Sequence, residues 1–408
     1  MSGLTHADPL AVVEQRVASG ERLSAADGIA LFESKDLLRV GRLADQVRRQ
    51  RVGDDVYFVV NRHINYTNVC RNRCRFCAFS RAEGEPGAYT LTVDEVVGKA
   101  REAVDQGATE IHIVGGENPT LPYASIRAMI AGVRQVAPAA HIKAFTASEI
   151  ACFAEMEKTD VEDVLSDLKS AGLDSMPGGG AEIFRAEVRA EVCPSKISGE
   201  RWLDIHRIAH GLGLKTNATM LYGHVESYAD RVDHLLRLRE AEDATGGFQA
   251  FIPLAFQPKN SALSHLPPTT GVDDLKTLAV SRLLLDNFLH IKTYWIMTGL
   301  KPAQVALFFG ADDMDGTVVE EVISLMSEAG HGQTVSKAEL IRVIRDAGRT
   351  PVERDALYQV VRRYGARRGA ASDDDGECGV AGDGDRHGRQ SPPVAEPGAR
   401  GPGAGGSP

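Results

Sequence analysis

The sequence predicts an α/β protein: a TIM-like (β/α)8 or partial barrel with N-terminal helices and a C-terminal helical cap. Short apolar runs alternate with amphipathic stretches along most of the 408 residues, which is typical of parallel strands joined by right-handed helical crossovers. Seven strands are clear from this alternation, and the region near Gly310 leaves room for an eighth. The most unusual segments follow the strands, at the end where barrel active sites lie.

The first 55 residues are expected to form a helical segment of their own. Amphipathic stretches predict helices there over residues 10–17, 24–33 and 37–50. Ser24 favours an N-cap for the second helix, because a serine hydroxyl accepts a hydrogen bond from a free backbone N–H of the first turn.

Residues 56–317 are expected to form the barrel itself. Apolar runs predict its strands over residues 56–67, 110–114, 141–146, 173–176, 215–221, 248–254 and 291–297. Apolar residues at helical spacing predict its helices over residues 92–106, 123–137, 161–171, 198–212, 228–244, 271–287 and 302–309. A capping box formed by Thr92 and Glu95 begins the first of these helices, and Gly172 ends the third.

Two further segments follow the barrel. Residues 318–369 are expected to form a C-terminal helical extension. Residues 370–408 contain ten Gly and five Pro but no Leu, Ile, Met or aromatic residue. Such a segment cannot bury enough apolar surface to offset its ordering entropy, so a disordered tail is predicted there.

Composition and charge exclude several classes of protein. The hydrophobic fraction of 43% and the charged fraction of 25% suit a globular protein with a sizeable core. The net charge of −10 makes non-specific nucleic-acid binding unfavourable, since few phosphates could be neutralised. The sequence has no apolar run of about 18 residues for a transmembrane helix, and its N-terminus lacks the pattern of a secretory signal. We therefore expect a cytoplasmic protein that binds neither nucleic acid nor membrane.

Three of the six cysteines lie close together, namely Cys70, Cys74 and Cys77. Soft thiolates on one short loop suit an iron–sulfur cluster or zinc. Three thiolates can hold three corners of a [4Fe-4S] cluster and leave the fourth iron free to bind a small molecule. The alternative is structural zinc completed by a ligand such as His63 or a distant cysteine. Structural zinc sites usually show a second, clearly spaced ligand pair, and no such pair follows here.

The spacing Cys-x3-Cys-x2-Cys after the first barrel strand resembles the radical S-adenosylmethionine (radical SAM) superfamily. The resemblance implies a barrel of the radical SAM type, in which the open iron binds the amino and carboxylate groups of the methionine moiety of SAM. One electron entering the cluster would then cleave the sulfonium and release a 5′-deoxyadenosyl radical. The resemblance also implies an electron donor such as flavodoxin or ferredoxin.

Longer segments are similar to one subgroup, the futalosine-pathway menaquinone enzymes and the radical SAM halves of deazaflavin (FO) synthase. The resemblance covers residues 40–365, and two segments look most like the aminofutalosine (aminodeoxyfutalosine) synthases, residues 214–224 and 246–256. The segments shared with the subgroup are residues 65–70, 73–79, 111–116, 143–147, 173–183, 216–226, 247–258 and 310–317.

The resemblance implies roles for several residues around SAM. Gly115, Gly116 and Glu117 follow a predicted strand, and Gly-Gly-Glu elsewhere in the superfamily contacts the methionine amino group. Aminofutalosine synthases tend to have Leu-His where this chain has Glu117 and the following residue, so the chain departs from its subgroup there. Either Glu149 or Glu182 is expected to bond a ribose hydroxyl of SAM. The alternative role for each is to cap a helix.

The substrate of the aminofutalosine synthases is 3-[(1-carboxyvinyl)oxy]benzoate. The resemblance implies that the radical adds to its vinyl carbon. Aryl migration and loss of a carboxyl group as bicarbonate would then give 6-amino-6-deoxyfutalosine, a step in menaquinone biosynthesis, while methionine leaves. Two substrate carboxylates require cations or several hydrogen bonds in a closed cavity. The candidate substrate residues are His63, Asn65, Arg81, His224, Lys292 and Asp313.

Two alternatives remain open at this point. A sibling enzyme, the dehypoxanthine futalosine cyclase or the FO synthase subunit, would use the radical to abstract hydrogen or to join a different acceptor. A zinc-stabilised barrel protein without catalytic activity would keep the fold and the cysteines. The sequence identifies no catalytic acid or base.

Overall fold

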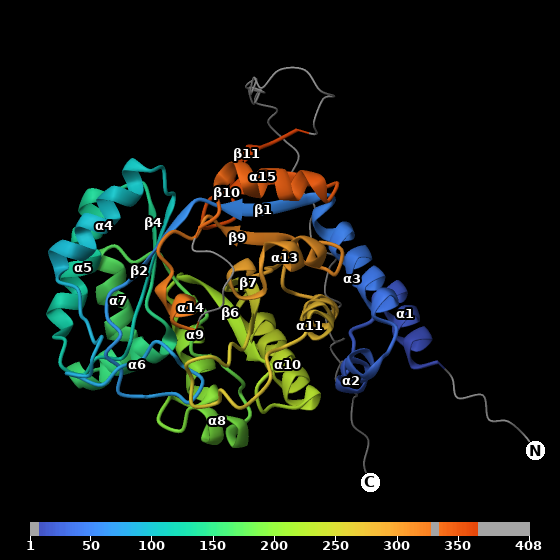
Figure 1. Ribbon diagram of the computed structural model, residues 1–408, viewed down its shortest axis with the longest axis horizontal. Helices are drawn as coiled ribbons and strands as arrows, with labels where there is room; N and C mark the ends of the chain where they lie inside the picture. The colour runs from blue at the N-terminus through green and yellow to red at the C-terminus, as the bar shows by residue number, and fades with distance from the viewer. Residues whose placement is uncertain (1–7, 328–333, 366–408) are drawn as a thin grey trace, which may run out of the picture. The chain divides into compact units, whose positions relative to one another are not determined.

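The computed structural model describes residues 8–327 and 334–365, which belong to one compact unit. The tail predicted over residues 370–408 lies outside the described residues. Figure 1 shows a curled parallel sheet covered by helices and joined to a second, smaller sheet. No helix in the two described ranges is long and apolar enough to cross a membrane.

The large sheet contains seven parallel strands in the same order as they occur along the chain. This arrangement confirms the predicted α/β fold and makes the sheet a partial barrel with β2 at one edge and β8 at the other. The strands are β2 (Asn61–Asn65), β3 (Glu110–Val114), β4 (His141–Ala144), β5 (Ser175–Met176), β6 (Lys215–Tyr222), β7 (Phe248–Ala255) and β8 (His290–Ile291).

The opening between β8 and β2 is spanned by residues 313–319. Lys292 forms an isolated parallel bridge with Asp313, and Arg62 forms another with Val319. The eighth strand expected near Gly310 is therefore present as β9 (Asp313–Gly316), but β9 belongs to the second sheet. Single bridges thus close the barrel where a full strand pair would be expected.

The second sheet has the strand order β11-β10-β1-β9, with β1 at Asp55–Val59, β10 at Thr350–Arg354 and β11 at Val360–Arg363. Figure 1 shows β1, β9 and β10 side by side, next to α15 (Lys337–Asp346). The strand predicted over residues 56–67 is in fact two strands, because the chain leaves the second sheet after β1 and enters the barrel with β2.

The extension predicted to be helical over residues 318–369 is only partly so, since β10 and β11 lie at its end. Asp55 pairs with Thr350 in a parallel register. The partner that makes residues 350–354 a strand is therefore almost 300 residues away, and local periodicity cannot reveal it.

Helices enclose the barrel and connect its strands. Those before the barrel, α1 to α3, confirm the predicted N-terminal helices, and α3 packs on α11. The helices are α1 (Pro9–Ser19), α2 (Ala25–Glu33), α3 (Leu37–Val52), α4 (Val93–Asp105), α5 (Tyr123–Val136), α6 (Ala147–Glu157), α7 (Val161–Ala171), α8 (Ala186–Val192), α9 (Gly199–Gly211), α10 (Tyr228–Thr245), α11 (Gly271–Leu284), α12 (Trp295–Thr298), α13 (Leu300–Ala306), α14 (Val322–Met326) and α15.

Three helices differ from the sequence prediction, and one of them is α8, which forms at Ala186–Val192 where no helix is predicted. Residues 147–157 carry no predicted helix, yet α6 forms there because Thr146 and Glu149 make a reciprocal capping box. The strand predicted over residues 291–297 ends with β8, and α12 begins at Trp295. The indole of Trp295 donates a hydrogen bond to the carbonyl of Gly316 at 3.0 Å, so tertiary contacts bury this apolar residue without a strand.

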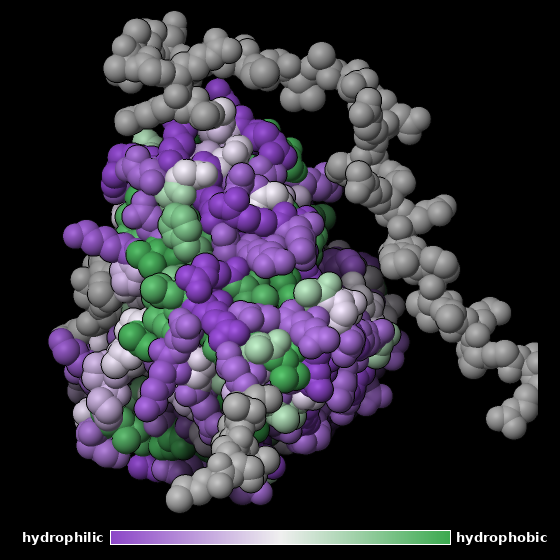
Figure 2. Space-filling model, turned by 90° about the vertical axis from the view of Figure 1, so that its right-hand side faces the viewer, coloured by the Kyte–Doolittle hydropathy of each residue, from purple (hydrophilic) through white to green (hydrophobic). Residues whose placement is uncertain are grey.

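The alternating side chains of β3 separate two environments. Ile111 and Ile113 are fully buried in the hydrophobic core, whereas Glu110 and His112 line a cavity inside the barrel. Figure 2 shows the face of the molecule on the side of α1 and α3, where hydrophilic side chains predominate and hydrophobic ones occur in small groups. The polar interior of the barrel is thus distinct from its apolar outer packing.

Candidate active site

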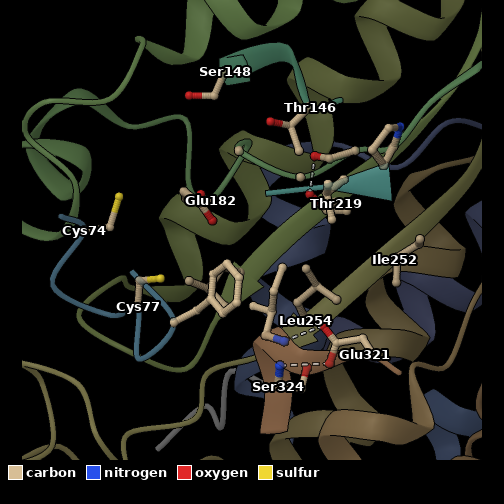
Figure 3. A pocket seen from close by; sticks show the side chains of 18 of the residues that line it. Cys74, Cys77, Thr146, Ser148, Glu182, Thr219, Ile252, Leu254, Glu321 and Ser324 are labelled. Carbon is tan, nitrogen blue, oxygen red and sulfur yellow. Dashed lines mark hydrogen bonds between the residues drawn. The ribbon is translucent and has the colours of Figure 1, made fainter. Parts of the chain in front are cut away.

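A cavity of about 310 Å³ lies inside the barrel, and Figure 3 shows part of its lining. The lining includes three groups of residues, a loop end, an apolar belt and a polar floor, besides others such as Glu321 and Ser324. The loop end contains the thiols and the segments that follow the strands: Cys70, Cys74, Cys77, Gly115, Gly116, Glu117, Ser148, Glu149, Glu182 and Lys196. The apolar belt contains Val114, Leu221, Ile252, Leu254 and Phe256. The polar floor contains His63, Glu110, His112, Lys143, Lys292 and Asp315.

The cysteine loop is held by backbone hydrogen bonds. The amide of Cys70 donates to the carbonyl of Arg81 at 3.0 Å, and that of Cys77 donates to the carbonyl of Cys74 at 3.0 Å. Cys74 is buried, whereas Cys70 and Cys77 are half-buried. Figure 3 shows the Cys74 and Cys77 side chains on the same side of the cavity, near Glu182. One short loop therefore presents all three thiols to the cavity.

The donor chemistry of this loop fits an iron–sulfur cluster. All three cysteines are free thiols, and thiolates are the protein ligands that such clusters require. In the part of the chain that the structure describes, no three His, Cys, Asp or Glu side chains stand at the spacing of a single-ion site. Gly116 packs so closely behind the loop that an added Cβ would lie 2.2 Å from the carbonyl oxygen of Val69.

The carboxylate of Glu117 is buried at the loop end. It accepts hydrogen bonds from the Asn72 amide and the Ser148 hydroxyl. The Nε of Arg71 donates to it at 3.2 Å. These contacts hold the Glu117 carboxylate beside the cysteine loop. The resemblance to radical SAM enzymes implies that the amino group of SAM binds at this position.

Glu149 takes part in the capping box at the start of α6. Helix capping is one of the two roles that the sequence suggests for it, the other being a hydrogen bond to the ribose. Its Oε2 accepts from the Thr146 amide and hydroxyl at 2.7 and 2.8 Å, and its Oε1 accepts from Tyr66 and the Gly115 amide at 2.9 and 3.0 Å. Burial raises the pKa of Glu149 to about 7, although these four hydrogen bonds favour the charged form. Both oxygens are thus occupied by the protein.

Glu182 makes a different set of contacts. Its carboxylate lies 2.8 Å from the ammonium of Lys196, and both side chains line the cavity. Burial opposes its charge, yet the neighbouring Lys196, Arg189 and His224 together lower the pKa of Glu182. A charged, cavity-lining carboxylate of this kind can accept a hydrogen bond from a ligand hydroxyl.

Two of the six predicted substrate residues, His63 and Lys292, line the polar floor. Asn65 and Asp313 lie outside the cavity lining and make contacts within the fold. The Asn65 amide donates to the carbonyl of Val114 at 3.2 Å. Asp313 pairs with Arg354 at 2.7 Å, and both side chains are fully buried away from the cavity lining.

Arg81 and His224 also lie outside the cavity lining. The guanidinium of Arg81 donates to the carbonyls of Ala78 and Ser80 at 2.9 Å each, so it organises the end of the cysteine loop. The ring of His224 contacts the carbonyl of Leu221 at 3.1 Å. Asp315, two residues beyond the predicted Asp313, is the acidic side chain of this segment that faces the cavity.

Four residues of the polar floor carry no sequence prediction: Glu110, His112, Lys143 and Asp315. Lys143 lies 2.6 Å from Glu110, and Lys292 lies 2.8 Å from Asp315. A signal existed, because Glu110 and His112 alternate with isoleucines, as expected when one face of a strand meets a polar interior. Charged side chains on a buried strand are themselves unusual.

The fold and the site define the class of protein. The model of the radical SAM superfamily matches residues 64–238, and the model of the CofH/MqnC C-terminal region matches residues 245–365. The chain belongs to the radical SAM superfamily and is an enzyme of its transferase type. Membership implies a [4Fe-4S] cluster and SAM, in agreement with the three cavity thiols.

Individual relatives confirm the subgroup that the sequence resembles. Aminodeoxyfutalosine synthase of Thermus thermophilus is 48% identical over 360 residues, covering 87% of this chain and 97% of its own. The 5-amino-6-(D-ribitylamino)uracil–L-tyrosine 4-hydroxyphenyl transferase of Methanopyrus kandleri is 42% identical over 359 residues, covering 86% and 97%. The fold is also that of the [FeFe]-hydrogenase maturase HydG, with a TM-score of 0.68 at 16% identity over 87% of this chain and 78% of HydG.

Proposed function

We propose that this chain joins the 5′-deoxyadenosyl group of SAM to 3-[(1-carboxyvinyl)oxy]benzoate, giving 6-amino-6-deoxyfutalosine, methionine and bicarbonate in menaquinone biosynthesis. The order of zones in one cavity carries the proposal: three thiols, then an apolar belt, then a polar floor. An aromatic enol ether has a matching order of groups: its reactive vinyl carbon would face the thiols, its ring the apolar belt and its ring carboxylate the polar floor. The identity with aminodeoxyfutalosine synthase supports it further.

The loop end is proposed to hold SAM. A [4Fe-4S] cluster on Cys70, Cys74 and Cys77 would supply the electron that cleaves the sulfonium. Glu117 would accept a hydrogen bond from the methionine ammonium, and Glu182, kept charged by Lys196, would accept one from a ribose hydroxyl. These contacts orient the sulfonium toward the belt, and orientation lowers the entropic part of the barrier.

The belt and the floor are proposed to hold the acceptor. Leu221, Ile252 and Leu254 would pack against the aromatic ring and exclude water, since an apolar wall offers no hydrogen bond to solvent. His63 and Lys292 would face a substrate carboxylate. Enclosure also protects the radical from groups that could quench it, which is the usual task of the protein in cofactor chemistry.

The electron donor is proposed to approach the cysteine loop in the cytoplasm. Arg71, Arg73 and Arg75 are exposed and alternate along the loop with buried or half-buried residues. Arg71 pairs with Glu117 and Glu155, and Arg73 pairs with Glu85. The positive charge of Arg75 next to the thiols favours encounter with an acidic electron carrier such as flavodoxin or ferredoxin. High ionic strength should slow such a reduction step.

The test is product mass spectrometry after anaerobic incubation with SAM, reductant and the enol ether. SAM labelled in the ribose should place its label in the nucleoside product at about one equivalent per turnover, with little free 5′-deoxyadenosine. Free 5′-deoxyadenosine in step with turnover, and no adenosyl adduct, would instead identify a hydrogen-abstracting sibling. A colourless, iron-free protein containing zinc after anaerobic purification would identify the non-catalytic alternative.

A further inference from the structure

The polar floor of the cavity contains a row of three side chains at one level of the barrel. In the strand registers, His63 of β2 is the direct partner of His112 of β3, and His112 is the direct partner of Lys143 of β4. The two imidazole rings stack with their centroids 4.4 Å apart. All three residues line the cavity, so the row forms a continuous polar surface.

The charged groups of the floor are already balanced without a ligand. Lys143 pairs with Glu110, and Lys292 pairs with Asp315. No hydrogen bond to the ring of His63 or His112 occurs in the described structure, and the Nε2 atom of His63 is buried without a partner. Buried polar groups are normally hydrogen-bonded. The histidine pair is thus the part of the floor that lacks a partner.

His112 is better placed than His63 to contact a ligand. It is half-buried, and its open surface contributes to the cavity wall, whereas His63 is only 4% exposed. His63 stacks against His112 and limits the orientations that its ring can take. His112 therefore offers the ligand a polar ring of fixed position.

We infer that the polar floor is a binding subsite for an aromatic carboxylate, in which His112 donates a hydrogen bond to the carboxylate beside the Lys143–Glu110 and Lys292–Asp315 ion pairs. The inference rests on the proposed function, where it assigns the ring carboxylate of the substrate to the floor. His112 is then a specificity-determining residue that positions the acceptor and takes no part in the chemical steps.

The depth of the floor agrees with this assignment. Because a strand rises about 3.3 Å per residue, His112 lies roughly 7 Å before Val114, the last residue of β3. Val114, one inward position further, belongs to the apolar belt. A ligand that reaches both the loop end and the floor needs an apolar middle and an end that can accept a hydrogen bond from the histidine pair. The ring and its carboxylate meet that requirement.

The experiment measures binding of two probes, 3-hydroxybenzoate and phenol, to the protein loaded with its cluster and SAM. These probes differ only in the carboxylate. Wild type should bind 3-hydroxybenzoate much more tightly than phenol. His112→Phe keeps an aromatic ring but loses the donor, so it should weaken 3-hydroxybenzoate binding between about 10-fold and 100-fold, the range expected for a lost hydrogen bond to a charged group. Phenol binding should be unchanged.

Two further variants act as controls. His112→Gln retains a donor and should recover part of the preference for the carboxylate. His206 is also buried, has an Nε2 atom without a partner, and packs on Trp202 with centroids 3.7 Å apart, but it lies outside the cavity lining. His206→Phe should therefore leave both probes bound as in wild type.

The inference is overturned if wild type does not distinguish the probes, or if His112→Phe leaves 3-hydroxybenzoate binding intact or weakens both probes equally. If the variant does not fold, a crystal structure of the unchanged protein with 3-hydroxybenzoate decides, because the carboxylate must lie within hydrogen-bond distance of His112. Failure of the proposed function has a different signature: the probe preference persists in wild type, while the enol ether yields no adenosyl adduct.

Discussion

The carboxylate of Glu182 and the ammonium of Lys196 form a buried ion pair at 2.8 Å on the wall of the cavity, on the side where Cys74 also lies (Figure 3). The pair joins the glycine-rich segment that follows β5 to the segment that precedes α9. Removing one partner of such a pair leaves an uncompensated buried charge. Glu182 and Glu149, which are equivalent candidates for the ribose in the sequence, make different contacts, and we propose Glu182 as the ribose ligand and Glu149 as a helix cap.

Exchanging each carboxylate for an amide tests these two roles, with SAM binding as the property that separates them. Glu182→Gln should weaken SAM binding by about tenfold, the effect of losing a charge-assisted hydrogen bond, and should also lower the stability because Lys196 loses its partner, while iron content stays unchanged. Glu149→Gln should instead lower the free energy of unfolding by about 1–3 kcal/mol, because a buried cap with four hydrogen bonds is disturbed. Equilibrium SAM binding and urea denaturation measure the two effects. The reverse pattern would show that Glu149 holds the ribose.

The three loop cysteines should each be required for the cluster. Cys70→Ala, Cys74→Ala and Cys77→Ala should lose iron, the brown colour and SAM cleavage, since each removes one thiolate from a three-ligand site. Cys152→Ala is the matched control, because Cys152 is fully buried outside the cavity lining and should keep its iron. A variant without all three loop cysteines that still bound four irons would refute the assignment.

Gly116 should tolerate no side chain. In Gly116→Ala the new Cβ would lie 2.2 Å from the Val69 carbonyl oxygen and 2.9 Å from the Cβ of Cys70. The cysteine loop must then move, at a cost of about 1–3 kcal/mol for overpacking, and iron content should fall. Iron analysis and thermal unfolding of the anaerobic protein measure both effects.

Gly98→Ala is the control for that change. Gly98 lies within α4, and an added Cβ meets no atom within 4 Å. Alanine favours a helix interior over glycine by about 0.5–1 kcal/mol, so this variant should be slightly more stable and keep its iron. If Gly116→Ala and Gly98→Ala lost iron equally, the close contact between Gly116 and the cysteine loop would not be what iron binding depends on.

Acid should destabilise the protein through buried neutral histidines. The ring of His234 is fully buried, stacks on Phe184 at 3.9 Å and contacts the Thr219 carbonyl at 2.9 Å. Burial lowers the pKa of His234 to about 3. A base with a lowered folded-state pKa contributes stability that is complete above its unfolded value of about 6.5 and is lost as the pH falls toward 3.

His234→Phe tests this dependence, because it keeps an aromatic ring but cannot take up the proton. Between pH 7 and pH 5, wild type should lose on the order of 2 kcal/mol more unfolding free energy than the variant. Urea denaturation of the metal-free protein at the two pH values measures the difference. An identical loss in both proteins would show that His234 does not become charged on unfolding.

Much of the fold follows from local sequence. The segments that form β3, β4, β6 and β7 contain buried apolar residues in short runs or in alternation with polar ones. Several helices carry their own caps, such as the capping box of Thr92 and Glu95 that begins α4. The cysteine spacing likewise predicts the thiol ligands, since three thiols within one loop remain neighbours in any fold. These features depend on residues that are close in the chain.

Other features were decided only by tertiary structure. The break between β1 and β2, and the strand character of residues 350–354, depend on pairing between Asp55 and Thr350. The contacts that distinguish Glu149 from Glu182 are also tertiary, since Glu149 accepts a hydrogen bond from Tyr66 while it caps α6. Asp315 faces the cavity, whereas Asp313 is held by Arg354.

The physical reason is the same in each case. Local sequence by itself determined the alternating strands and helices, their caps and the thiol loop, because periodicity and capping act over a few residues. Only the tertiary structure decided that His63, His112 and Lys143 form one row. Which polar side chains share a cavity depends on strand register and on the partners that compete for each group, and these partners lie far apart in the chain.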